Sequence, residues 1–282
     1  MREGTPSRTA LRVALRRAAH QLLDHPLVLD DPVALRVIGG KRAEALRRDP
    51  AGFEKSKLDP YFRASMAVRS RFAEDVLGQA VARGVRQYVL LGAGLDTFAY
   101  RNPHPELRVF EVDHPDTQAW KRWRLAQGGV EIPESVTYAP VDFEAQTLSD
   151  GLAAVGFDAT APAQFAMLGV VPYLTVESLE STWRFVAGSA SGRGIVFDYS
   201  PPPASMSWGQ RAVYAVMARR VAAVGEPWKT FFMPNDLQRR LTALGFSTFE
   251  DLDGDAINAR YFAERADKLR VGGAGRLMHA ST

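Results

Sequence analysis

The stretch QYVLLGAGLDTFAYR, residues 87–101, decides the fold. Its apolar block at 88–91 is too short for an independent helix and ends at a glycine, which is typical of a strand buried on both faces. Gly92 and Gly94 flank Ala93 and allow backbone angles, or close approaches, that a Cβ atom would block. The pattern predicts a strand, a tight glycine turn and the start of a helix. Backbone N–H groups would then face a crevice at the carboxyl end of a sheet, where nucleotide-like ligands bind.

The residues after the turn discriminate between cofactors. A dinucleotide fingerprint G-x-G-x-x-G needs a glycine at position 97, where this chain has Thr97. Asp96 would place a negative charge where a pyrophosphate approaches the helix N-terminus, which is unfavourable. The turn therefore favours a ligand with a positive or neutral centre, such as S-adenosylmethionine, over NAD. Asp96 could also act as the N-cap of the following helix, and the two roles are compatible.

Carboxylates follow two further strands. Asp113 comes after the segment 107–112, about 20 residues beyond the turn, which is the separation at which a second-strand acid reaches a ribose diol. Both hydroxyls could donate charge-assisted hydrogen bonds to its two oxygens. Asp142 follows the strand predicted at 136–140 and could accept the adenine amino group. Phe143 could pack on the base or belong to the core.

Strand and helix patterns alternate along the whole chain. This predicts an α/β, Rossmann-like and mostly parallel sheet with helices on both faces. A single domain 1–282 would comprise an N-terminal helical cap (1–85), a cofactor-binding core (86–200), a lid insertion (201–233) and the C-terminal part of the sheet (234–282). The strands are predicted at 88–91, 107–112, 136–140, 164–171, 194–199, 246–252 and 276–280, and the helices at 8–23, 33–38, 61–83, from 115 through 125, from 175, and at 210–224. A last helix would begin with Asn235 and Gln238 as a capping box.

Composition excludes several classes of protein. The 282 residues carry a formal net charge of +3, and the arginines are scattered, so nucleic-acid binding has no support. The chain has no cysteine, which removes disulfides, cysteine–zinc sites and thiol nucleophiles, and we expect no metal. No apolar run approaches the roughly 18 residues of a membrane span, and we expect a cytoplasmic protein without membrane contact. The oligomeric state is not determined by the sequence.

Five segments together carry a family resemblance: VLLGAGLDTFAYR, VFEVDHP, VDFE, LGVVPYLT and NARYFAERADKLRVGG. The chain resembles the leucine carboxyl methyltransferase-like family of class I S-adenosylmethionine-dependent methyltransferases, within its bacterial branch of small-molecule enzymes. The resemblance implies a seven-stranded sheet, and S-adenosylmethionine as cofactor. The cofactor-binding residues that it implies are Arg69 for the methionine carboxylate, Gly92, Ala93 and Gly94 along the cofactor, Asp113 for the ribose, Asp142 and Phe143 for the adenine, and His114 and Leu168 nearby. Arg8 would add a second positive charge for the carboxylate.

One departure concerns the acceptor. Protein-methylating members of the family have a glutamate where this chain has Leu168, so a protein substrate is not expected. The prediction is O-methylation of a small molecule, at a carboxylate or a hydroxyl of an aromatic or polyketide-like metabolite of secondary metabolism. A carboxylate needs no general base, whereas a hydroxyl could use His114 or Tyr173.

The acceptor pocket is expected under the N-terminal helix and the lid insertion, whose aromatic side chains would make it apolar. The arginines that could anchor an acid group are Arg260, Arg265 and Arg270. Two alternatives stay open at this point: an NAD-dependent oxidoreductase, and a catalytically silent module that has kept the cofactor fold.

Overall fold

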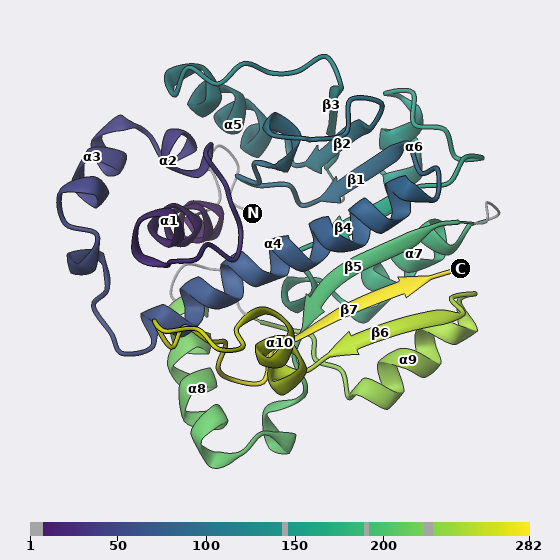
Figure 1. Cartoon of the computed structure of the whole chain (residues 1–282). Helices are drawn as coiled ribbons and strands as arrows, with labels where there is room; N and C mark the ends of the chain where they lie inside the picture. Colours follow the sequence, from purple (N-terminus) through teal and green to yellow (C-terminus); the bar gives the residue numbers. More distant parts are fainter. Residues whose placement is uncertain (1–7, 143–145, 189–191, 223–227) are drawn as a thin grey trace.

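The computed structural model describes residues 8–142, 146–188, 192–222 and 228–282, and its centre is one seven-stranded sheet. The strands run in the spatial order β3-β2-β1-β4-β5-β7-β6 (Figure 1). All neighbouring pairs from β3 to β5 are parallel, while β7 is antiparallel to both β5 and β6. The strands are β1 (Gln87–Leu91), β2 (Arg108–Asp113), β3 (Val136–Pro140), β4 (Gln164–Met167), β5 (Gly194–Tyr199), β6 (Thr248–Leu252) and β7 (Arg276–Ser281). The predicted fold class is confirmed.

Helices cover both faces of the sheet. In Figure 1, α4 crosses the front of the sheet, whereas α6, α7 and α9 lie behind it. The α-helices are α1 (Arg8–Leu23), α2 (Ala34–Val37), α3 (Gly40–Arg48), α4 (Asp59–Ala82), α5 (Pro115–Gln127), α6 (Leu148–Ala153), α7 (Val176–Ala187), α8 (Trp208–Ala222), α9 (Pro234–Ala243) and α10 (Gly254–Tyr261). Short 3-10 turns are η1 (Ala51–Phe53), η2 (Phe98–Tyr100), η3 (Val171–Tyr173) and η4 (Pro203–Ser205). Three helices, α3, α6 and α10, were not predicted.

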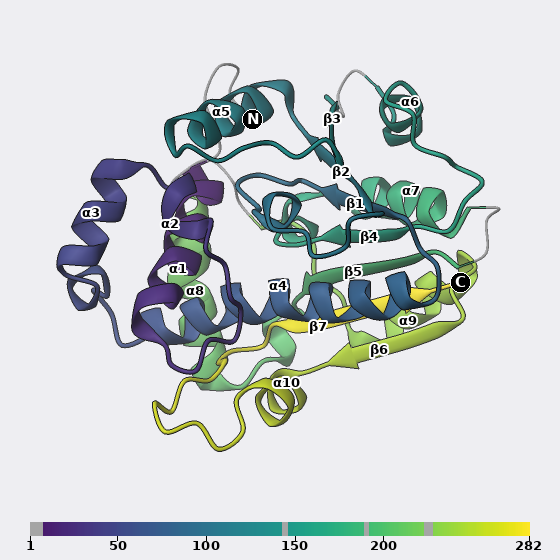
Figure 2. The same ribbon diagram turned by 45° about the horizontal axis from the view of Figure 1, so that its top comes forward.

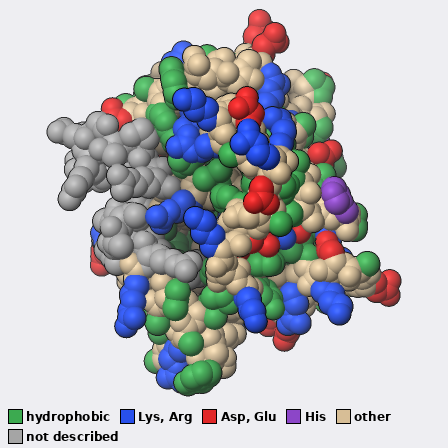
Figure 3. Space-filling model, turned by 90° about the vertical axis from the view of Figure 1, so that its left-hand side faces the viewer, with side chains coloured by type: hydrophobic (Ala, Val, Ile, Leu, Met, Phe, Trp, Pro, Cys, Tyr) green, Lys and Arg blue, Asp and Glu red, His purple; other side chains and the backbone are tan. Residues whose placement is uncertain are grey.

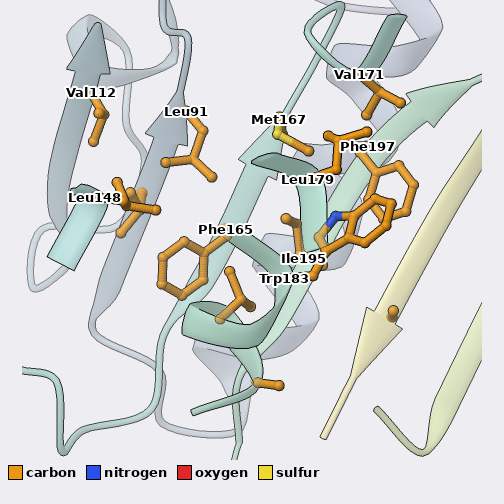
Figure 4. Close-up of a cluster of buried hydrophobic side chains, with 14 of the residues drawn as sticks. Leu91, Val112, Leu148, Phe165, Met167, Val171, Leu179, Trp183, Ile195 and Phe197 are labelled. Atoms are coloured by element: carbon orange, nitrogen blue, oxygen red, sulfur yellow. The ribbon is translucent and has the colours of Figure 1, made fainter. Parts of the chain in front are cut away.

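The strand alternation builds two cores. Val89 and Leu91 of β1 face the helices α6, α7 and α9, while Tyr88 and Leu90 face α4. Figure 4 shows the first core, with Trp183 of α7 packed over the strands, its ring stacked on Phe197 at a centroid distance of 5.3 Å. Successive strand residues point to opposite faces, so a strand covered on both sides reads as an unbroken apolar run.

The N-terminal helices form a third apolar cluster beside the sheet. Small residues of α1, among them Ala14 and Ala18, pack against α2 and α3, and against Leu95 of the glycine turn. Figure 2 shows α1, α2 and α3 together at one end of the molecule, next to the start of α4. Figure 3 turns this end toward the viewer, and many lysine and arginine side chains are spread over it. The described N-terminal region therefore packs against the carboxyl end of the sheet.

Three sequence expectations about elements were wrong. The glycine turn leads into the 3-10 turn η2 instead of an α-helix, because the Asp96 side chain accepts the Phe98 N–H (2.8 Å) and two prolines follow by residue 105. The strand predicted at 164–171 ends at Met167. The capping box is absent: α9 begins at Pro234, and its N-cap Met233 makes no side-chain cap.

Candidate active site

The glycine turn after β1 closes tightly against its neighbours. Gly92 has φ +68°, and a Cβ atom there would lie 2.6 Å from a methyl carbon of Val170. Gly94 has φ +48°, and its Cβ would lie 3.2 Å from Ala10 of α1. Larger side chains would be strained by the backbone angle and would collide with α1 and with the loop after β4. The turn is glycine-rich because two other segments approach it.

A cavity of about 1170 Å³ lies at this end of the sheet. It is lined by residues that follow β1, β2, β3 and β4, by the inner side of α1 and by α7. Every described residue that the sequence proposed for the cofactor or for catalysis lines it, namely Arg69, Gly92, Ala93, Gly94, Asp113, His114, Asp142, Leu168 and Tyr173. Phe143 and the side chain of Arg8 lie outside the described residues.

Asp113 ends β2 and holds the turn. Its Oδ2 accepts the Gly94 N–H (2.6 Å) and its Oδ1 accepts the His114 N–H (2.7 Å). Burial raises the pKa of Asp113 above its ordinary value, although these two N–H donors oppose the shift. A carboxylate has about four acceptor sites, so roughly two remain available to a ligand. Asp113 therefore both fixes the turn and presents lone pairs to the cavity.

His114 and Tyr173, the two candidate bases, both border the cavity. His114 is the N-cap of α5, and its Nδ1 accepts the Asp116 N–H at 3.2 Å. That hydrogen bond uses the Nδ1 lone pair and leaves the ring proton on Nε2. Tyr173 ends η3 and lines the cavity beside Leu174.

Arg69 comes from α4 and is 9% exposed, so it does not reach the outer surface along its stem. Its Nη1 lies 3.4 Å from Oδ2 of Asp198, at the carboxyl end of β5. The other Asp198 oxygen accepts the Gly169 N–H. A Cβ atom on Gly169 would lie 2.7 Å from Arg69 Nη1. The guanidinium is thus lodged between β4 and β5, with an acid on one side and the cavity on the other.

Asp96 pairs with a cation that the sequence did not single out. Its Oδ2 lies 3.1 Å from Arg17 Nη1, and Arg17 also donates to the Leu95 carbonyl at 2.6 Å. Burial alone would raise the pKa of Asp96, but Arg17 and Lys121 hold it below its ordinary value. Arg17 also lies 3.7 Å from the fully buried Asp31. This network fastens α1 to the glycine turn.

A second buried ion pair stands behind the turn. Glu111 of β2 is fully buried and lies 2.7 Å from Lys121 Nζ of α5. The Tyr100 hydroxyl donates to the same carboxylate at 3.1 Å. Burial raises the pKa of Glu111, against the opposing effect of Lys121. The residue does not line the cavity, so its charge supports α5 and not a ligand.

Two expectations about the acceptor side were wrong. Arg260 pairs with Glu250 and Arg265 with Asp267, and neither they nor Arg270 line the cavity, so none is placed to anchor an acid there. Of the described residues in 201–233, only Lys229 lines it, and Trp208 is 81% exposed. Within that segment Tyr214 packs against Trp228 and Phe231, and Phe232 packs on Trp183 of α7 in the core; none of these aromatic residues lines the cavity.

Sequence reasoning missed three charged residues of this region: Arg17, Asp198 and Lys229. Arg17 is followed by Ala18 and Ala19, small residues that allow a helix to pack closely. Asp198 is the last residue but one of the buried strand β5, close to where Asp113 lies in β2. Lys229 is a single cation in the aromatic stretch PWKTFF. These features are visible in the sequence around each residue, but they do not indicate which other segment of the fold the residue contacts.

The described residues contain no cluster of three or more histidine, aspartate or glutamate side chains that could hold a metal ion. Within the same residues, no helix combines the length and the apolar character needed to cross a lipid bilayer. The cavity itself offers the Arg69 guanidinium and the carboxylates of Asp113 and Asp142, which suit an organic ligand bearing a carboxylate and a diol.

Comparisons with known proteins point the same way. The family model described as "Leucine carboxyl methyltransferase" matches residues 10–187. A Bacillus subtilis (strain 168) protein named "Putative S-adenosyl-L-methionine-dependent methyltransferase YktD" is 33% identical over an alignment of 302 positions, covering 99% of each chain. A similarly named protein of Mycobacterium marinum is 32% identical, over 78% of this chain and 71% of the relative.

Solved structures share the fold. A structure from Thermobifida fusca, described as a "putative methyltransferase", covers all of this chain and 96% of its own, with a TM-score of 0.57 and 17% identity. A DUF574 family protein from Streptomyces avermitilis covers 95% of this chain and 97% of its own, with a TM-score of 0.52 and 18% identity. At these identities the likeness concerns the arrangement of the sheet and its helices.

Proposed function

This chain belongs to the leucine carboxyl methyltransferase family and is an S-adenosylmethionine-dependent methyltransferase, and we propose that it methylates an oxygen of a small molecule. The acceptor would be a carboxylate or a hydroxyl of an aromatic or polyketide-like metabolite. The observation that carries the proposal is the order of charged groups along the cavity, which matches the order of groups along the cofactor.

That order follows from the sheet. The strands β3, β2, β1, β4 and β5 lie side by side, at about 4.8 Å per step. Asp142 follows β3, Asp113 ends β2, the glycine turn follows β1, and Arg69 lies at the ends of β4 and β5. We assign Asp142 to the adenine amino group, Asp113 to the ribose diol and Arg69 to the methionine carboxylate.

The donor groups of the cavity suit this assignment. Arg69 pairs with Asp198, and the negative charge of Asp198 offsets part of the cost of burying the Arg69 guanidinium. A guanidinium can bind a second carboxylate through its remaining N–H groups, because it carries five donors in a fixed fork. Asp113 keeps free acceptor sites for two hydroxyls. The N–H groups of Gly92 and Ala93 donate to the Val112 carbonyl and that of Gly94 donates to Asp113, so the turn is fixed while its glycines let a ligand approach the backbone closely.

When bound, S-adenosylmethionine supplies a methyl group whose bond to sulfur breaks, both electrons staying on sulfur, as the acceptor oxygen bonds to the carbon. The chain's own residues then have to align the acceptor and exclude water. Such proximity contributes roughly 7 to 11 kcal/mol in favourable cases. A carboxylate acceptor needs no base. For a hydroxyl acceptor, Tyr173 is the better candidate of the two, since the Nδ1 lone pair of His114 is engaged with Asp116.

The small-molecule acceptor is supported by Leu168. This apolar residue lines the cavity, where protein-methylating members of the family have a glutamate. An apolar wall at that point suits the hydrocarbon body of a small acceptor. The inner side of α1 adds Ala10 and Val13 to the same wall. An acid or phenol with an apolar ring or chain fits this lining.

Titration calorimetry with S-adenosylmethionine, S-adenosylhomocysteine and NAD tests the assignment of the cofactor. We expect binding of both sulfur ligands and none of NAD. Substitution Arg69→Met should weaken S-adenosylhomocysteine, which carries the same carboxylate, and should leave adenosine binding unchanged. Binding of NAD without either sulfur ligand would overturn the proposal.

A further inference from the structure

We propose that the N-terminus of α3, together with Arg42 and Arg124, binds a phosphate group. The site lies at the corner where α2 contacts both α3 and α5, and Figure 1 shows α2 between the other two helices. Neither arginine lines the cofactor cavity, so the inference is independent of the cofactor and of the methyl acceptor. The carrying observation is a buried arginine without an acidic partner, whose guanidinium lies at the uncapped start of a helix.

The first turn of α3 leaves its backbone N–H groups open to a ligand. The N-cap of this nine-residue helix is Gly39, which makes no side-chain cap, and the first turn contains no acidic residue. The next two residues, Gly40 and Lys41, are exposed, and their N–H groups donate to no acceptor in the described part of the chain. Free N–H groups and the positive end of the helix dipole together attract an anion.

Arg124 of α5 brings a cation to the same point. It is 7% exposed, and its Nη1 would lie 2.9 Å from a Cβ atom added to Gly39. Its Nη1 donates to the Val37 carbonyl at 3.3 Å, whereas its buried Nε has no hydrogen-bond partner among the described residues. Within the same residues it forms no ion pair with a carboxylate. A buried guanidinium is costly unless an anion pairs with it, so this arginine lacks a negative partner.

A second arginine adds to the positive charge of this corner. Burial and, after it, the charge of Arg42 lower the pKa of Arg124, and no carboxylate opposes the shift. Arg42 is exposed in the first turn of α3, where its N–H donates to the Gly39 carbonyl at 3.0 Å. The single acid of α3, Glu44, is two residues from Arg42, a separation at which helical side chains do not face each other. An anion bound between the two guanidinium groups would relieve their mutual repulsion.

A phosphate group fits these donors. Its several oxygens can accept backbone N–H groups at a helix N-terminus and, at the same time, N–H groups of the guanidiniums. Trp123 lies beside them, 56% exposed, with its ring centroid 6.0 Å from the guanidinium carbon of Arg124. The phosphate could belong to a small molecule or to a lipid headgroup, because both present the same oxygens to the site.

Calorimetry with inorganic phosphate, against chloride at equal ionic strength, tests the site. We expect the wild type to bind phosphate, and Arg42→Gln to weaken binding about ten-fold, as for a lost hydrogen bond between charged groups. Gly40→Pro should weaken it several-fold, because it removes one N–H without changing any charge, at the first helical position, where proline is tolerated. Arg47→Gln is the matched control, since it removes an exposed arginine from the last turn of α3, and it should retain wild-type affinity.

Arg124→Met should abolish phosphate binding, with thermal unfolding as the check on its fold. Because Arg124 is buried, the exposed substitutions Arg42→Gln and Gly40→Pro decide the question if that variant does not fold.

Vesicles separate the two sources of phosphate. Cosedimentation with phosphatidylcholine vesicles that contain phosphatidic acid, but not with phosphatidylcholine alone, would assign the site to a lipid headgroup if Arg42→Gln reduces it. Calorimetric binding of inorganic phosphate without cosedimentation would assign it to a small phosphate compound. A wild type that responds to neither probe would overturn the proposal. Binding that is unchanged in both Arg42→Gln and Gly40→Pro would place the phosphate elsewhere and would overturn it too.

Discussion

Substitutions of Asp113 test whether this carboxylate binds the ribose of the cofactor. Asp113 ends β2, and its two oxygens accept the backbone N–H groups of Gly94 (2.6 Å) and His114 (2.7 Å). Asp113→Ala removes these contacts together with the acceptors that we assign to the ribose hydroxyls. Asp113→Asn keeps one oxygen but turns an amide NH₂ toward a backbone N–H. Both variants should bind cofactor less well, and the asparagine variant should retain more of the glycine turn.

The magnitude follows from the charge of the acceptor. Hydrogen bonds to a charged group contribute about 1.5 to 3 kcal/mol. Asp113→Ala should therefore weaken S-adenosylhomocysteine by a factor of about 10 to 150. Burial raises the pKa of Asp113. On acidification, the affinity of the wild type for S-adenosylhomocysteine should therefore begin to fall at a higher pH than it would if this aspartate had its ordinary pKa. The affinity is complete above the raised pKa and is lost as the pH falls through it.

Calorimetric titration of S-adenosylhomocysteine into each variant measures the effect, with thermal unfolding as the check on folding. Asp75→Ala is the matched control, since Asp75 also accepts two hydrogen bonds, from Arg71 and Tyr261, but does not line the cavity. It should leave the dissociation constant unchanged. A wild-type dissociation constant for folded Asp113→Ala would refute the ribose assignment.

Three further substitutions test two buried ion pairs beside the cavity and a half-buried histidine of β7. Lys121→Met leaves the buried Glu111 carboxylate without its cation and should lower the free energy of unfolding, measured in urea, by about 3 to 5 kcal/mol. The double variant Lys121→Met/Glu111→Gln should recover most of that loss, and equal stability of the single and double variants would contradict this explanation. Arg17→Met should destabilise the protein by a similar amount and weaken cofactor binding, because α1 loses its ion pair with Asp96. A variant as stable as the wild type would contradict the role of this ion pair. Burial, together with the nearby Arg83, lowers the pKa of His279 to about 4 in the folded protein. As the pH falls from 6.5 to 4, His279 is therefore protonated in the unfolded chain before it is protonated in the folded one, and the free energy of unfolding should drop by up to about 3 kcal/mol. His279→Gln should flatten that part of the stability curve in urea titrations at several pH values, and an unchanged slope would show that other groups cause it.

The sequence was most informative at positions where a single physical reason explains the choice of residue. Gly92 and Gly94 predicted the turn because positive φ angles and close neighbours demand glycine. Asp113 and Asp142 predicted the cavity because parallel strands end at the same edge of a sheet. Arg69, which the family resemblance singled out, lies in the cavity lining beside Asp198.

The sequence was least informative where a residue's role depends on a distant segment. Asp96 could be an N-cap or a ligand contact by its position alone, and its pairing with Arg17 depends on how α1 packs, 79 residues earlier. Arg260 and Arg265 looked available for a substrate, yet each meets an acid close in sequence. Lys229 gave no periodic signal, because a single cation between aromatic residues gains meaning only from the cavity beside it.

One transfer experiment decides whether the protein methylates a small molecule. The protein would be incubated with S-adenosylmethionine carrying a deuterated methyl group and a small-molecule extract, and both the small-molecule and the protein fractions would be read by mass spectrometry. We expect the label to enter a small acid or phenol, and we expect Asp113→Ala to transfer far less of it. Label found only in the protein fraction, or in neither fraction while S-adenosylhomocysteine still binds, would contradict it.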